Sequence, residues 1–161
     1  MQIIQTNRLL LRPISLDDAD FIMNLINCQG FIRYIGDRKV RTRDQAIDYL
    51  QNMLGNPDIT YWAIETKLGQ VPVGVVTWVQ RDFLPSPDLG YALLPEYEGN
   101  GYAFEASEAW LAYQLKTHKS ALAICRADNL ASIKLLLKLN FVREEIFEKE
   151  GHEMHRYSLH S

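Results

Sequence analysis

Residues 93–106 read Leu93-Leu94-Pro95-Glu96-Tyr97-Glu98-Gly99-Asn100-Gly101-Tyr102-Ala103-Phe104-Glu105-Ala106, and they lead from an apolar strand through two glycines into a helix. Gly99 and Gly101 let the backbone N–H groups of this junction turn toward one point at the positive end of the helix. The junction therefore predicts a site for an anion such as pyrophosphate. Taken alone, the glycine pair is equally consistent with a tight turn between a strand and a helix.

Downstream of the junction, the sequence predicts a helix, a buried strand, a second helix and a hairpin. A helix over 101–116 is followed by the nearly all-apolar segment 121–125, which is typical of a strand covered on both faces. Asn129 is a suitable cap for a helix that runs through Leu139, and segments 144–149 and 154–159 predict a closing hairpin. The buried face of the first helix is expected to contain Ala103, Ala106, Ala109, Trp110 and Tyr113.

Upstream, the order predicted is one strand, two helices and three sheet segments. The strand lies at 9–11, and the helices are capped by Ser15 and by Thr42, each with an acidic or amide side chain three residues later. The sheet segments lie at 61–65, 71–79 and 88–94, the first two forming a hairpin. The second helix should place Ile47, Leu50 and Leu54 inward before Gly55. This order predicts an α+β fold with a mostly antiparallel sheet.

Composition excludes several classes of protein. A chain of 161 residues predicts a single domain over 1–161, and no apolar run approaches the ~18 residues that a membrane span needs. The net charge of −3 without a basic block argues against nucleic acid as a partner. Cys28 and Cys125 cannot form a disulfide framework, and no apolar leader follows the polar start Met1-Gln2, so we expect a cytoplasmic protein.

Several motifs occur in a fixed order along the chain. They are the glycine junction, Gly90-Tyr91 before it, the N-terminal Arg8-Leu9-x-Leu11-Arg12 followed by Asp17-Asp18-Ala19, and Asn129-x-x-Ser132 followed by Lys138-Leu139-x-Phe141. Together they resemble the Gcn5-related N-acetyltransferase (GNAT) superfamily, in particular the branch of the ribosomal-protein alanine N-acetyltransferases. The resemblance covers essentially the whole chain. It implies a central sheet of about six or seven strands flanked by about four helices.

The resemblance also implies a site. It places acetyl-CoA, with no metal, in a gap beside the central strand, where backbone N–H groups around Leu93 and Leu94 hold the pantetheine arm and the thioester carbonyl. Asn129 matches the family asparagine that binds pantetheine. The acceptor implied is a primary amine, either a protein N-terminus or a small molecule, reached by direct transfer; an oligomer is possible. The junction residues implied to hold the coenzyme are Glu98, Gly99, Asn100, Gly101, Tyr102 and Ala103.

Three departures from the family pattern are visible. Glu96 occupies the position of a family glutamine or arginine, and Glu98 adds a second acid beside the expected pyrophosphate site. These acids should weaken anion binding unless they point to solvent. Asn140 replaces a glycine after the last helix, where asparagine still tolerates a left-handed backbone. Leu136 stands where many family members carry a general-acid tyrosine.

Two residues remain as catalytic candidates. Ser132 matches the family position from which a hydroxyl faces the sulfur of the coenzyme, although a helix serine can equally bond an upstream carbonyl. Asp88 either holds a water that takes the amine proton or is a turn acid that makes local contacts. Cys125, on a buried strand, is not expected to form an acyl intermediate. The alternative function is an acyl-CoA-binding module without catalytic activity.

Overall fold

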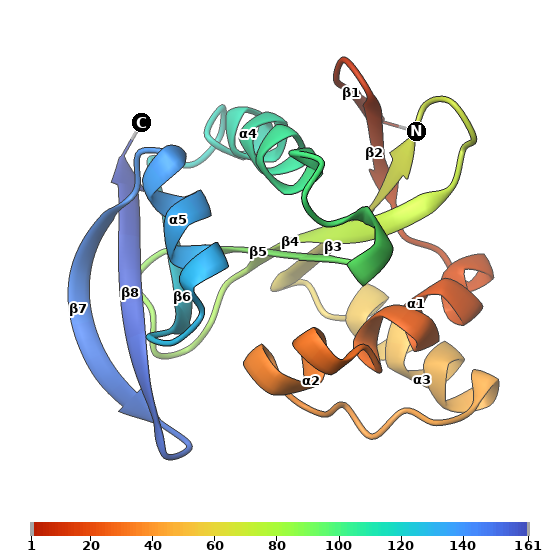
Figure 1. The fold of residues 1–161 in the computed structure, drawn as a ribbon, viewed down its shortest axis with the longest axis horizontal. Helices are drawn as coiled ribbons and strands as arrows, with labels where there is room; N and C mark the ends of the chain where they lie inside the picture. Colours follow the sequence, from red (N-terminus) through yellow and green to blue (C-terminus); the bar gives the residue numbers. More distant parts are fainter. Residues whose placement is uncertain (1, 161) are drawn as a thin grey trace.

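The computed structural model describes residues 2–160, so residues 1 and 161 of the predicted domain lie outside the described residues. It contains an eight-stranded, mostly antiparallel sheet in the order β1-β2-β3-β4-β5-β6-β8-β7 (Figure 1). The strands are β1 (Ile4–Gln5), β2 (Leu9–Pro13), β3 (Ile59–Thr66), β4 (Pro72–Val79), β5 (Asp88–Leu93), β6 (Ser120–Arg126), β7 (Val142–Lys149) and β8 (His152–His160). The helices are α1 (Ala19–Ile26), α2 (Gln29–Tyr34), α3 (Arg43–Leu54), α4 (Tyr102–Gln114) and α5 (Leu130–Lys138), with short 3₁₀ turns η1 (Leu16–Asp18) and η2 (Pro95–Tyr97).

The expected α+β class and mostly antiparallel sheet are confirmed, with small differences in element count. Two elements were missed by the sequence patterns. β1 has only two residues, and α2 lacks a capping side chain at Cys28. Such short elements, or elements without a capping residue, leave no clear periodic pattern of apolar residues in the sequence.

The sheet separates two layers of helices (Figure 1). Helices α1, α2 and α3 cover one face, where a core forms around Ile22, Leu50 and Val75. Helices α4 and α5 cover the other, where Trp110 and Leu136 pack with Leu89 of β5. The side chains of β5 alternate between these two cores, so this central strand contributes to both.

The helix caps follow the predicted pattern. The Thr42 hydroxyl accepts from the Gln45 N–H at 3.1 Å, and the Ser15 N–H donates to the Asp18 carboxylate at 2.9 Å. Asn140 has a φ of 71° and ends α5, as expected from its tolerance of this conformation. The prediction that Leu54 points inward was wrong. Leu54 is 49% exposed, because it lies at the very end of α3, next to Gly55.

The strands β5 and β6 run parallel but separate almost at once. Their register consists of the single pair Asp88–Leu122. On its other side β5 is paired with β4 along its whole length, from Asp88 to Leu93. The edge of β5 beyond Asp88 is therefore open inside the sheet. Asp88 and Leu89 are buried, whereas Tyr91 to Leu94 are only partly buried.

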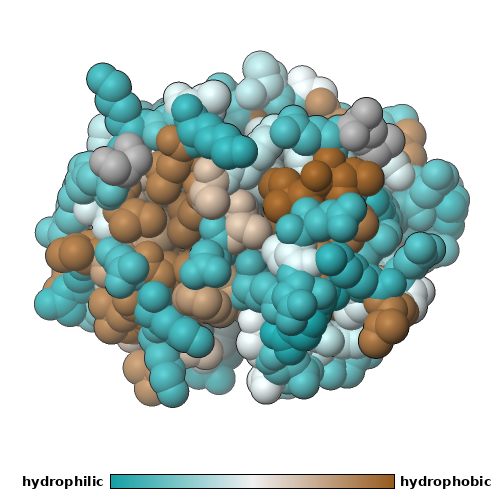
Figure 2. Space-filling view, turned by 90° about the horizontal axis from the view of Figure 1, so that it is seen from above, coloured by the Kyte–Doolittle hydropathy of each residue, from teal (hydrophilic) through white to brown (hydrophobic). Residues whose placement is uncertain are grey.

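Seen from above, hydrophobic side chains gather on the side of the molecule that carries α5 and β7, and again beside the N-terminal hairpin (Figure 2). Exposed apolar side chains on α5 and β7 are Leu130, Leu137, Val142 and Ile146. Within residues 2–160, no helix has both the length and the apolar character needed to cross a membrane.

Candidate functional site

The glycine junction forms a turn that points unpaired backbone donors outward. Gly99 and Gly101 have φ values of 80° and 79°, a conformation that costs energy for any residue with a side chain. The Glu105 N–H donates to the Gly101 carbonyl at 3.1 Å, but within residues 2–160 the backbone N–H groups from Gly99 to Phe104 find no protein acceptor. These donors lie at the positive end of α4 and can bind an anion.

Arg8, in the turn between β1 and β2, holds this junction in place. Its guanidinium donates to the Asn100 carbonyl at 2.8 Å and to the Glu105 carboxylate at 2.8 Å, and it lies 4.6 Å from the centre of the Tyr102 ring. A Cβ atom at Gly101 would lie 3.3 Å from this guanidinium. Arg8 belongs to the N-terminal sequence motif, but the sequence alone gave it no role, because only the fold brings it close to residues almost a hundred positions away.

The Glu105 carboxylate is held by several contacts with the turn between β1 and β2. The carboxylate accepts from the Thr6 hydroxyl at 2.5 Å and from the Arg8 backbone N–H at 2.9 Å, besides the guanidinium. Burial alone would raise the pKa of Glu105, but the bonds from Thr6 and Arg8 outweigh it and lower the pKa. Its negative charge therefore balances Arg8 and does not depend on a ligand.

The charges around the junction are divided between two sides. The Lys138 ammonium of α5 lies 4.2 Å from the centre of the Phe104 ring, so it adds a positive charge beside the first turn of α4. Glu96 and Glu98 are exposed and act electrostatically on Cys28, between α1 and α2. The two acids thus lie toward the α1–α2 side. The Glu98 N–H donates to the Pro95 carbonyl at 3.2 Å, so the free backbone donors begin only at Gly99.

The open edge of β5 supplies a further backbone donor. The Leu94 N–H donates to the Val73 carbonyl at 2.8 Å, which contradicts the expectation that this group is free for a ligand. Because successive residues of a strand point their N–H groups to opposite edges, the Leu93 N–H points the other way, toward the gap beside β6. Within the described chain, the Leu93 N–H is therefore free for a ligand at this edge, whereas the Leu94 N–H is engaged within the sheet.

Asn129 and Ser132 lie together at the start of α5. The Asn129 side-chain oxygen accepts from the Ser132 N–H at 3.2 Å, which confirms the expected cap. Its amide nitrogen has no acceptor in the part of the chain that the structure describes, and Asn129 is only partly buried. One side chain can thus cap the helix through its oxygen and bind a ligand through its nitrogen.

The Ser132 hydroxyl contacts two buried or partly buried side chains from neighbouring strands. The Tyr91 hydroxyl of β5 lies 2.5 Å from Ser132 Oγ, and Ser132 also acts on the thiol of Cys125 on β6, where it lowers the pKa of the thiol against the effect of burial. Burial raises the pKa of Tyr91 to about 12 and that of Cys125 to about 11. Both groups are protonated at neutral pH, so Cys125 is a poor nucleophile. Sequence reasoning missed Tyr91 as a partner of Ser132.

Asp88 does not lie with these residues. It sits at the start of β5, where the strand still pairs with β6, and it is 2% exposed. Its carboxylate is paired with the Arg81 guanidinium, and burial raises its pKa although Arg81 opposes the shift. Asp88 and Tyr91 point to opposite faces of the strand because they are three residues apart. The placement fits a turn acid that makes local contacts.

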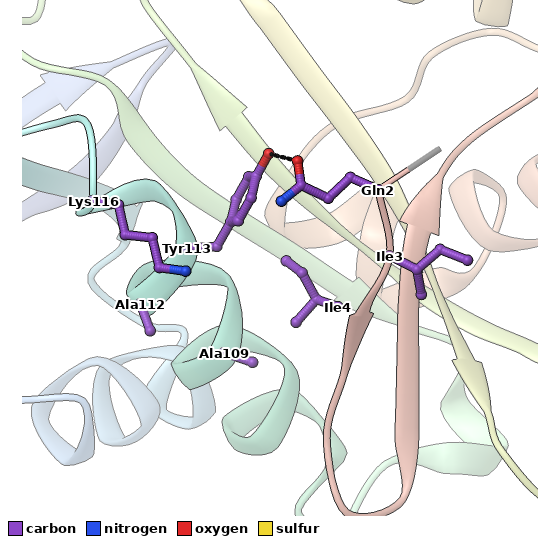
Figure 3. A pocket seen from close by; sticks show the side chains of 7 residues that line it. All are labelled: Gln2, Ile3, Ile4, Ala109, Ala112, Tyr113 and Lys116. Carbon is purple, nitrogen blue, oxygen red and sulfur yellow. Dashed lines mark hydrogen bonds between the residues drawn. The ribbon is translucent and has the colours of Figure 1, made fainter.

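Two surface cavities lie apart from this cluster. One, of about 360 Å³, is formed between β1 and the second half of α4, where the Tyr113 hydroxyl donates to Gln2 Oε1 at 3.0 Å (Figure 3). Another, of about 270 Å³, lies beside Trp78 and His118. Neither is lined by the glycine junction, Asn129 or Ser132. The cavity beside β1 is lined by Gln2, Ile3, Ile4, Ala109, Ala112, Tyr113 and Lys116.

Among residues 2–160, no three metal-ligating side chains gather in one place.

Comparisons with known proteins agree on one family. The model of the acetyltransferase (GNAT) domain matches residues 8–142. The uncharacterized N-acetyltransferase YoaA of Bacillus subtilis (strain 168) is 28% identical over an alignment of 159 residues. The match covers 91% of this chain and 86% of YoaA.

Solved structures share the fold. One is RimL, a ribosomal L7/L12 alpha-N-protein acetyltransferase in complex with coenzyme A, with a TM-score of 0.88, 16% identity and coverage of 99% of this chain and 98% of that one. Another is spermidine N-acetyltransferase from Vibrio cholerae in complex with CoA and spermine, with a TM-score of 0.83, 17% identity and coverage of 96% of each chain. The family match spans most of the sequence, and the chain therefore belongs to the GNAT family of acetyl-CoA-dependent acetyltransferases.

Proposed function

We propose that this protein transfers an acetyl group from acetyl-CoA directly to a primary amine, with a cationic acceptor that approaches from the α1–α2 side. The run of unpaired backbone N–H groups from Gly99 to Phe104, at the start of α4, is the observation that supports a binding site for the coenzyme. A pyrophosphate fits such donors, and the Lys138 ammonium beside Phe104 adds a positive charge.

The residues present also fit the rest of the coenzyme. The open edge of β5 offers the Leu93 N–H to a carbonyl oxygen, and Asn129 offers its amide nitrogen to the pantetheine arm. A backbone donor fixed in a strand needs no reorganisation as charge develops on a thioester oxygen, which is how such donors stabilise transition states. Bound acetyl-CoA would supply the activated acetyl group.

The chain's own residues then manage the protons. The amine nitrogen forms a bond to the acetyl carbon as the carbon–sulfur bond breaks, so one proton leaves the amine and one reaches the sulfur. Ser132 is the proposed donor to the sulfur, and water returns a proton to Ser132. The amine proton passes to water. Because the pKa of Cys125 is raised, an acyl-cysteine step is not part of the proposal.

The acceptor class follows from charge and from the cost of deprotonation. Glu96 and Glu98 are exposed beside the α1–α2 junction and form no ion pair within residues 2–160, so they attract cations. Deprotonating an α-amine at pH 7 costs about 1 kcal/mol, against about 4.6 kcal/mol for a lysine. The cost of deprotonation therefore favours a peptide N-terminus over a lysine side chain. A polyamine, whose primary amines are about as basic as lysine, fits the site only through its several positive charges.

The test measures release of free CoA thiol on addition of amines. The panel contains peptides with free N-termini, the same peptides with blocked N-termini, spermidine and a lysine-containing peptide with a blocked N-terminus. Acetyl-CoA should raise the melting temperature, since a ligand at a hundredfold excess over Kd stabilises the folded state by about 2.7 kcal/mol. Amine-dependent thiol release is expected for the free N-termini or for spermidine.

Binding of acetyl-CoA without thiol release from any amine would favour the alternative, a binding module without catalytic activity. No thermal shift at millimolar acetyl-CoA would contradict the coenzyme site itself. Preference for neutral or acidic acceptors would contradict the role given to Glu96 and Glu98.

A further inference from the structure

The surroundings of Ser132 contain more than the proposed reaction uses. Three polar side chains from three different elements meet at one point: Tyr91 of β5, Cys125 of β6 and Ser132 of α5. Only the serine has been given a role in the transfer. Tyr91 and Cys125 come from the two strands that separate after Asp88–Leu122, so their contacts with Ser132 lie where the gap opens.

Within residues 2–160, Ser132 lacks the hydrogen bond that is usual for a serine within a helix. A serine within a helix commonly donates its hydroxyl proton to a carbonyl three or four residues upstream, here that of Asn129 or Asp128. In the described chain, Ser132 Oγ forms no such bond. The Ser132 hydroxyl is instead hydrogen-bonded to the Tyr91 hydroxyl, at 2.5 Å.

The hydrogen-bonding capacity of Ser132 determines which proton is free. A serine hydroxyl has one proton to donate and two lone pairs that accept. Tyr91 and Cys125 both keep their protons at neutral pH, because burial raises the pKa of each. A phenol is more acidic than an alcohol, and in the described chain the Tyr91 hydroxyl has no other partner than Ser132, so Tyr91 donates to Ser132 Oγ and occupies one of its acceptor positions. The proton of Ser132 then remains for another partner.

We propose that Tyr91 is a positioning residue that holds Ser132 as an acceptor and so directs the single proton of Ser132 toward the sulfur that leaves in the transfer. The inference rests on the proposed acetyl transfer. The hydroxyl of Tyr91 lies close enough for a strong hydrogen bond and keeps its proton at neutral pH.

The test compares variants that remove single donors. Tyr91→Phe keeps the ring and should lower kcat by about 10- to 100-fold, while KM and Kd for acetyl-CoA change less than about threefold. The matched control is Tyr113→Phe, which removes a hydroxyl bonded only to Gln2 in the described structure and should leave kcat unchanged.

A double-mutant cycle separates positioning from a general structural effect. If Tyr91 acts through Ser132, Tyr91→Phe should lower kcat little further once Ser132→Ala is present. An equal loss in both backgrounds would overturn the inference, as would a loss of coenzyme affinity that matches the loss of kcat. Rates are taken from single turnovers with one identified acceptor, so that chemistry limits them.

The two proposals fail differently. If the unaltered protein binds acetyl-CoA but releases no thiol with any amine, the acetyl transfer fails and the positioning role fails with it. If the unaltered protein turns over and Tyr91→Phe retains its full kcat, the positioning role alone is wrong.

Discussion

The guanidinium of Arg8 donates to the backbone carbonyl of Asn100 at 2.8 Å, which ties the N-terminal β1–β2 turn to the glycine junction before α4. Asn100 lies between two glycines with positive φ, a segment with few conformational restraints of its own. Arg8 thereby limits the freedom of the backbone donors from Gly99 to Phe104. The junction is prepared for an anion by a residue that comes from the far end of the sequence.

Replacing Arg8 should weaken coenzyme binding more than folding. We expect Arg8→Ala to raise Kd for acetyl-CoA about tenfold, because the junction must then be ordered at the time of binding. The loss of unfolding free energy should stay near 1 kcal/mol, since the pair with Glu105 is partly exposed. Arg43→Ala, which breaks the exposed pair with Asp20, is the control. Titration calorimetry and thermal unfolding measure the two effects, and equal Kd values for both variants would contradict the prediction.

A side chain at Gly101 should be more harmful than the same side chain at Gly99. Both positions have positive φ, so valine is strained at each. A Cβ at Gly101 approaches Arg8 at 3.3 Å, whereas at Gly99 nothing lies within 4 Å. Gly101→Val is expected to abolish binding of acetyl-CoA while the protein still folds, and Gly99→Val to weaken binding less. Unchanged affinity in Gly101→Val, measured by titration, would place the coenzyme elsewhere.

Variants of Ser132 and Asn129 should affect different quantities, the first the rate of transfer and the second the affinity for the coenzyme. Ser132→Ala is expected to lower kcat by about 10²-fold or more with little change in Kd for acetyl-CoA, as for loss of a general acid. Asn129→Ala removes both the cap and the free amide nitrogen, so it should raise Kd and lower the melting temperature. Single-turnover rates and titrations measure the pair. A fully active Ser132→Ala would leave water as the proton donor.

Asp18 should contribute stability that disappears in acid. Burial raises its pKa, but the bonds from Arg12 and from the Ser15 N–H outweigh burial and leave the pKa below its usual value. The unfolded chain therefore binds the proton first, and the contribution is complete above about pH 5 and lost as pH falls through the folded-state pKa.

Asp18→Asn should cost about 2–3 kcal/mol at pH 7, toward the lower end for a buried pair because Arg12 is partly exposed. The difference from the unaltered protein should shrink below about pH 4. Asp20→Asn breaks an exposed pair and should cost less than about 1 kcal/mol. Urea unfolding over a series of pH values measures the free energy of unfolding of each variant. A difference between Asp18→Asn and the unaltered protein that stays constant with pH would exclude ionised Asp18 as the origin of the stability difference.

The sequence predicted those parts of the fold that local patterns control. The caps at Thr42 and Asn129 follow directly from side-chain chemistry, and so does the left-handed Asn140. The glycine junction was found for the same reason, because Gly99 and Gly101 take conformations that other residues avoid.

What the sequence could not predict depends on contacts between distant segments. Nothing local to Tyr91 indicates that its hydroxyl meets Ser132, 41 residues later, because α5 must first pack against the gap beside β5. The Leu94 N–H was assigned to a ligand because pairing with Val73 depends on strand register, which one strand alone does not reveal. The pairing of Asp88 with Arg81 also depends on the fold, and the sequence alone therefore left two interpretations of Asp88 open.

The single register pair between β5 and β6 has a consequence for how the molecule opens. It divides the hydrogen-bonded ladder into two blocks, β1–β5 and β6–β8, that share almost no backbone bonds. Amide exchange should therefore report two protected units with different opening free energies. A molecule whose extended arm lies along the open edge of β5 would act as the missing strand between the blocks, and its binding would join two units into one cooperative structure.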